Sequence, residues 1–101
     1  MTVDPTVQGL HEGVVNRLHM NGVEARVRAW ILDNFPLARE RDTGPNDPLL
    51  DNGIIDSLGT LELVAFLERE FGFIVEDEEM VADHFETIAS ITAFVKSKLE
   101  N

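Results

Sequence analysis

The chain has 101 residues, a formal net charge of −11 and no cysteine. This length, with 44% hydrophobic residues, predicts one domain with a single modest core, which leaves little room for a deep catalytic cleft. The negative charge argues against nucleic acid or anionic lipid as partners and favours proteins with basic surfaces. The lack of cysteine excludes disulfides and zinc-thiolate sites, so any thiol chemistry requires a group attached after translation.

The N-terminal segment differs in composition from the rest of the chain. Pro5, Gly9 and Gly13 interrupt a weak apolar pattern, so we expect residues 1–21 to form a flexible extension and residues 22–101 to form the domain. No apolar run reaches the length of a membrane span, and the first residues lack the basic-then-apolar order of a secretion signal. We therefore expect a cytoplasmic protein.

The first predicted helix covers residues 23–35, and a long loop follows it. One face of this helix collects apolar side chains at helical spacing, namely Val23, Val27, Trp30, Ile31 and Phe35. Pro36 is expected to stop the helix. Residues 36–56 contain Gly44, Pro45, Pro48 and Gly53 and are predicted to lack regular structure. A loop of this length in a small domain usually has a function.

The second predicted helix covers residues 57–71 and carries two apolar stripes. The first is expected in the core and consists of Leu63, Val64, Leu67 and Phe71. The second consists of Leu58, Leu61 and Ala65 and lies beside the acidic residues Glu62, Glu68 and Glu70. A surface helix needs only one buried stripe, so the second is either additional core or a partner-binding surface. We favour the partner-binding surface, because small apolar patches ringed by charge often mark interfaces.

The remaining sequence predicts two more helices. Residues 73–75 are expected to be a loop that closes the bundle, and the acidic run 76–79 is either a solvated loop or an extension of the recognition surface. A short helix is predicted over residues 81–85, with His84 half exposed. Thr87 should cap a last helix that turns Ile88, Ile91, Val95 and Leu99 inward. The predicted fold is an all-α, up-and-down four-helix bundle, with three longer helices, one short helix and a long first loop.

Ser57 stands where the long loop becomes a helix. Serine is a common helix N-cap, so Ser57 could simply accept a hydrogen bond from a backbone N–H one turn later. Its neighbours suggest more, because Asp56 precedes it, Leu58 follows it and an acidic amphipathic helix comes next. The triplet resembles the acyl carrier and peptidyl carrier protein family, and the resemblance extends over roughly residues 22 to 99.

The resemblance implies a function without catalysis. A separate phosphopantetheinyl transferase would attach 4′-phosphopantetheine to Ser57, with Asp56 in a supporting role, and the arm's thiol would hold a cargo as a thioester. Partner enzymes would bind the surface formed by Leu58, Leu61, Glu62, Ala65 and Glu68. These partners would be an acyl- or aminoacyl-loading (adenylating) enzyme and downstream acyl-processing enzymes, and the carrier would be a monomer.

The resemblance points to a specialised, stand-alone carrier. Gly59, Ala65 and Arg69 differ from the residues of many fatty-acid carriers, whereas the stretch from Asp56 to Thr60 is similar to that of carriers that work with adenylating enzymes, including the D-alanyl carrier proteins. The cargo and the pathway stay open.

Other functions fit the same residues less well. A serine hydrolase would need Gly-x-Ser-x-Gly and a histidine base, but Ile55 stands two residues before Ser57 where that motif has glycine. An EF-hand register that places Gly53 at the required glycine puts Gly59 where the bidentate glutamate belongs. An unmodified acidic adaptor that binds partners by the same face remains the alternative.

No dedicated metal site is predicted. We do predict that a divalent cation binds loosely among Asp56, Glu62 and residues 76–79 and raises the melting temperature more than NaCl does. The alternative is that these carboxylates are too dispersed to bind a cation.

Overall fold

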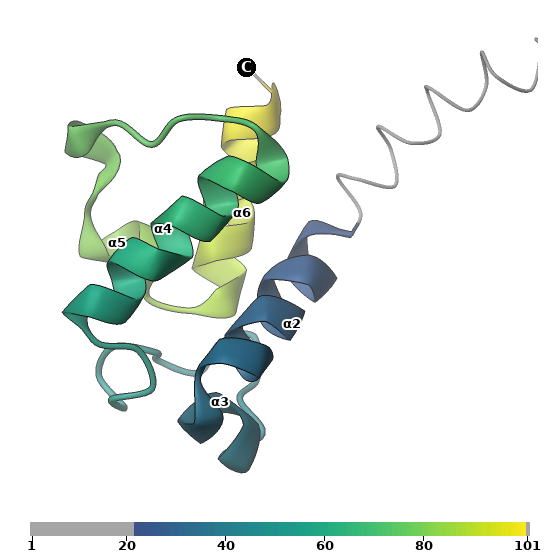
Figure 1. The fold of residues 1–101 in the computed structure, drawn as a ribbon, viewed down its shortest axis with the longest axis vertical. Helices are drawn as coiled ribbons and strands as arrows, with labels where there is room; N and C mark the ends of the chain where they lie inside the picture. Colours follow the sequence, from purple (N-terminus) through teal and green to yellow (C-terminus); the bar gives the residue numbers. More distant parts are fainter. Residues whose placement is uncertain (1–21, 101) are drawn as a thin grey trace, which may run out of the picture.

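The computed structural model describes residues 22–100, and the expected N-terminal extension lies outside this range. Within it the chain forms α-helices and one 3₁₀ helix, without strands (Figure 1). Their bounds are α2 (Val23–Asn34), α3 (Pro36–Glu40), α4 (Ser57–Phe71), η1 (Asp77–Glu79), α5 (Ala82–Phe85) and α6 (Ile88–Glu100). The prediction of an all-α bundle with three longer helices is confirmed.

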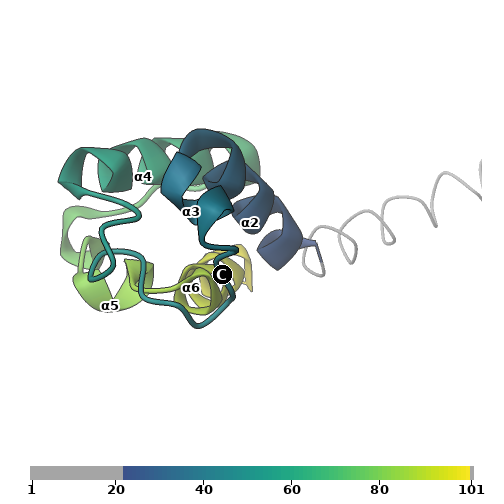
Figure 2. The same cartoon turned by 90° about the horizontal axis from the view of Figure 1, so that it is seen from below.

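The core lies between α2, α4 and α6, which surround a common centre when the bundle is seen from one end (Figure 2). Most of the residues predicted to face inward are buried there, namely Val23, Val27, Ile31, Leu63, Val64, Leu67, Phe71, Ile88, Ile91 and Val95. Trp30, Phe35 and Leu99 are only partly buried and pack against the edge of this cluster. The helical periodicity thus identified the buried faces, while the partly buried residues mark where the core ends.

The prediction that residues 36–56 lack regular structure is wrong at their start, because Pro36 begins α3 instead of only ending α2. Proline suits the first turn of a helix, where its missing N–H would have no intrahelical partner. It also disfavours helical geometry in the preceding residue. Phe35 accordingly has extended backbone angles, φ −128° and ψ 100°, and forms a corner between the two helices.

The rest of this segment is an irregular loop that is anchored to the other side of the bundle. Leu49 is fully buried, and its N–H donates to the Glu86 carbonyl at 2.8 Å. The Pro45 carbonyl accepts from the Ala89 N–H, also at 2.8 Å. These bonds tie the loop to the start of α6, so that the loop has a defined path into α4.

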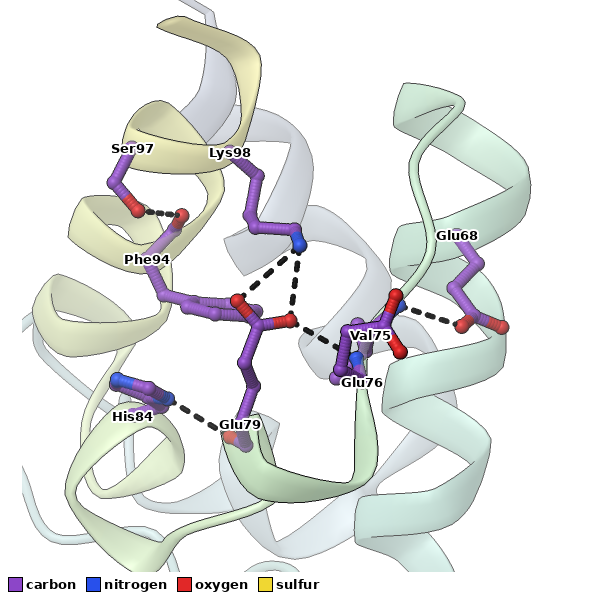
Figure 3. Close-up of polar contacts among 8 residues, drawn as sticks. All are labelled: Glu68, Val75, Glu76, Glu79, His84, Phe94, Ser97 and Lys98. Atoms are coloured by element: carbon purple, nitrogen blue, oxygen red, sulfur yellow. Dashed lines mark hydrogen bonds and ion pairs between the residues drawn. The ribbon is translucent and has the colours of Figure 1, made fainter. Parts of the chain in front are cut away.

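The connection formed by residues 72–80 is held to both neighbouring helices (Figure 3). At one end, Glu68 Oε2 of α4 accepts from the Val75 N–H at 2.9 Å. At the other, Glu79 accepts from the Glu76 N–H and from Lys98 Nζ of α6, both at 2.9 Å. The backbone hydrogen bond from Glu76, followed by Lys98, lowers the pKa of Glu79 below its ordinary value of 4.5. The acidic run is therefore partly structural and is not simply a solvated loop.

The structure agrees with the predictions made for residues 73–75, His84 and Thr87. Residues 73–75 form no strand, and Phe73 and Val75 pack against the core while Ile74 is exposed. His84 is half buried, with its ring stacked on Phe94 at 4.5 Å between centroids. Thr87 Oγ1 accepts from the Ser90 N–H at 3.0 Å, so Thr87 caps α6 as predicted.

Candidate functional site

Ser57 is the first residue of α4 and is exposed. The helix is capped by Asp56, whose Oδ1 accepts from the Gly59 N–H at 2.7 Å. Such a cap typically stabilises a protein by about 1 kcal/mol. The reading of Ser57 as the capping residue is therefore wrong, and among residues 22–100 its hydroxyl has no hydrogen-bond partner. The hydroxyl is free to react.

The loop before Ser57 holds it in a defined position. Ile54 and Ile55 are both buried, and their N–H groups donate to the Leu49 carbonyl at 2.9 and 3.1 Å. Only Asp56 separates this buried anchor from the serine. Ser57 is thus supported by the loop on one side and by the capped first turn of α4 on the other.

A pocket of about 230 Å³ opens beside Ser57. It is lined by Phe35, Gly53, Ile54, Asp56, Leu58, Gly59 and Glu62. Gly59 is buried, and a Cβ at this position would lie 2.8 Å from Cε1 of Phe35, closer than real Cβ contacts come. Only a glycine therefore lets the Phe35 ring lie this close to α4. Helical periodicity places Phe35 on the inward face of α2 and does not reveal this role, although a glycine inside a predicted helix is a signal of close packing.

Four of the residues predicted to bind partners are exposed along α4. Leu58 and Leu61 have relative exposures of 66% and 57%, and Glu62 and Ala65 are exposed as well. Glu68 differs, because it is half buried and its carboxylate accepts the Val75 N–H. The exposed apolar residues are thus concentrated in the half of α4 that follows Ser57.

The prediction of a loose cation site is wrong for the described residues. Asp56 precedes α4, whereas residues 76–79 follow its other end (Figure 1). In the part of the chain that the structure describes, no three His, Cys, Asp or Glu residues are grouped so that they could hold a metal ion. These carboxylates are therefore too dispersed to hold a cation. In the same range, no helix is long and apolar enough to cross a membrane.

The fold is a small helical bundle with an exposed serine at a capped helix start. The family model described as "Phosphopantetheine attachment site" matches residues 25–95 of the chain. An acyl carrier protein of Akkermansia muciniphila is 33% identical over 76 residues, which cover 75% of this chain and 91% of that protein. The chain belongs to the phosphopantetheine-binding acyl carrier protein family. Its prosthetic group is covalently attached 4′-phosphopantetheine, and by family it is a carrier and not a catalyst.

Proposed function

We propose that this protein carries acyl or aminoacyl groups as thioesters on a 4′-phosphopantetheine arm bound to Ser57 Oγ, and that it presents them to the enzymes of a biosynthetic pathway. The observation that carries the proposal is the exposed Ser57 hydroxyl, which Asp56 frees from capping α4. The family match covers this position, since it extends over residues 25–95.

The surroundings of Ser57 suit attachment of a phosphate. Ser57 Oγ forms the new bond to phosphorus, while coenzyme A loses its adenosine 3′,5′-bisphosphate and the serine proton passes to the transferase. The N-terminus of α4 carries partial positive charge, which favours a phosphodiester on its first residue. Asp56 keeps this first turn formed through the Gly59 N–H. The arm, once bound, supplies the thiol that the cysteine-free chain lacks.

The exposed side of α4 is the proposed surface for partner enzymes. Leu58, Leu61 and Ala65 provide an apolar strip next to the Glu62 carboxylate, and the chain has a net charge of −11. A complementary partner would present an apolar pocket flanked by Arg and Lys side chains. The proposed partners are a phosphopantetheinyl transferase, an adenylating enzyme that loads the cargo, and downstream acyl-processing enzymes. We place the carrier in the cytoplasm as a monomer.

Intact mass after incubation with coenzyme A, Mg²⁺ and a broad-specificity phosphopantetheinyl transferase tests the attachment. Wild type should gain the mass of one phosphopantetheine, and Ser57→Ala should gain none. Ser97→Ala is the matched control, because Ser97 is also an exposed helical serine and its loss should leave the gain unchanged. An unmodified wild type would favour the unmodified adaptor instead.

A further inference from the structure

The pocket lies at the start of α4, next to the residues that flank Ser57, although Ser57 itself is not part of its lining. Its lining includes both sequence neighbours of the serine, Asp56 and Leu58. A group bonded to Ser57 Oγ therefore begins within reach of the pocket. At about 230 Å³ the pocket is smaller than the roughly 300–1,000 Å³ of sites that enclose a whole small molecule. It can hold one segment of the attached group.

The apolar wall of the pocket depends on a contact between two distant parts of the chain. Phe35 comes from the corner between α2 and α3, and its ring reaches the first turn of α4 because Gly59 has no side chain. An added Cβ would also lie 3.1 Å from Ile55 Cγ2. Glycine is less favourable than alanine inside a helix, so helix formation gives no reason for this residue. The close approach of the Phe35 ring explains why glycine stands at this position.

We propose that this pocket binds the segment of the phosphopantetheine arm next to its phosphate, which carries two methyl groups on one carbon. The inference rests on the proposed attachment to Ser57. Phe35, Ile54 and Leu58 offer apolar surface to the two methyl groups. The carboxylate of Glu62 is an acceptor for the hydroxyl or the first amide N–H that follows the methyl-bearing carbon.

The charges of the lining determine which part of the arm enters. Asp56 and Glu62 are both carboxylates, so the anionic phosphodiester stays outside while the uncharged segment occupies the pocket. The thiol lies at the far end of the arm and remains outside as well. Holding the first segment against the domain reduces the number of conformations that the arm samples. The free part of the arm, with its cargo, would then pivot from the pocket and not from Ser57.

Loading the protein with two different arms tests the occupant. One arm comes from coenzyme A and the other from an analogue that lacks the two methyl groups, and intact mass verifies that each is attached. The natural arm should shift the NMR signals of the Ile54 methyls and the Phe35 ring and raise the melting temperature above that of the unloaded protein. The protein that carries the arm without methyl groups should show neither the NMR shifts nor the rise in melting temperature. The emission of Trp30, the only tryptophan, should change in parallel, since its ring centroid lies 5.6 Å from that of Phe35.

Variants test the pocket itself. Gly59→Ala should displace the Phe35 ring, so that the loaded protein gains mass without the shift at Ile54. Phe35→Leu, which removes one wall but keeps the site apolar, should reduce the shift and serves if Gly59→Ala does not fold. Ile74→Ala is the control, because Ile74 is 69% exposed outside the pocket, and it should retain the full shift.

The outcomes separate this inference from the proposed function. A wild type that gains mass without signal changes at Ile54 and Phe35, or that responds equally to both arms, would overturn the pocket assignment and leave the attachment standing. A wild type that gains no mass would overturn the attachment to Ser57 and the pocket assignment with it.

Discussion

The two halves of α4 lie in the same helix but serve different purposes. In the second half, Glu68 binds the 72–80 connection, Glu70 pairs with Arg26 of α2, and the Phe71 ring packs against that of Phe66. In the first half, Leu58 and Leu61 are exposed. The second half thus uses Glu68 and Glu70 to hold the fold together. The first half keeps its outer face available, while its cap, the contact at Gly59 and the buried Leu63 hold it in place.

This comparison shows that acidity alone does not mark a binding surface. Glu62 and Glu68 have the same chemistry and lie six residues apart in one helix, yet only Glu68 has a backbone N–H to bind. A carboxylate engaged in this way stabilises the domain, whereas an exposed one affects the encounter with a partner more than stability.

The largest contrast is expected between two leucines of α4. Leu67→Ala should lower the free energy of unfolding by about 2–5 kcal/mol, because Leu67 is fully buried in the core. Leu61→Ala removes the same atoms from a side chain that is 57% exposed and should change stability by less than about 0.5 kcal/mol. Urea unfolding followed by circular dichroism measures both. Similar losses would mean that Leu61 belongs to the core and does not bind partners.

Charge reversal separates the two glutamates. Glu68→Lys should cost about 1–3 kcal/mol, because the part-buried Val75 N–H loses its acceptor. Glu62→Lys should leave stability within about 0.5 kcal/mol and instead slow loading by the adenylating enzyme. Glu68→Gln, which keeps an acceptor oxygen, is the control for Glu68. Thermal melts and loading kinetics together decide, and an unchanged loading rate in Glu62→Lys would place the partner surface elsewhere.

Acid should weaken the anchoring of the 72–80 connection. The pKa of Glu79 is lowered in the folded state, so its stabilising contribution is present above the unfolded value near 4.5 and is lost as the pH falls through the folded value. Glu79→Gln should therefore flatten the decline in stability below about pH 4.5, while Glu78→Gln, an exposed neighbour on η1, serves as the charge-matched control. Melting temperatures between pH 7 and pH 3 provide the measurement. Parallel acid curves for wild type and Glu79→Gln would show that the charge of Glu79 adds no stability through its contacts with the Glu76 N–H and Lys98.

The smallest expected effect comes from salt. The net charge of −11 implies repulsion that is screened over a Debye length of about 8–10 Å near physiological ionic strength, so NaCl should raise the melting temperature modestly. Mg²⁺ at equal ionic strength should do no more, since residues 22–100 contain no cluster that could hold a metal. A greater rise with Mg²⁺ would reveal a cation site formed by residues outside that range or by a rearrangement.

The sequence determined the parts of this protein that depend on neighbours along the chain. Helical periodicity gave the bounds of α4 and its buried and exposed faces, and the start of that helix located Ser57 with Asp56 before it. It also contains a local signal for α3, because a proline suits the start of a helix as well as the position after its end, and Pro36 begins α3.

Tertiary structure decided what depends on residues far apart. The approach of Phe35 to Gly59 creates the pocket, and the hydrogen bonds of Glu68 and Glu79 assign those acids to the fold. None of these contacts produces a periodic pattern in the sequence, because each joins side chains or backbone groups of different elements. A pattern along one helix reveals which face it buries. Whether an acid on the other face meets an N–H, a lysine or only water is settled when the neighbouring elements pack.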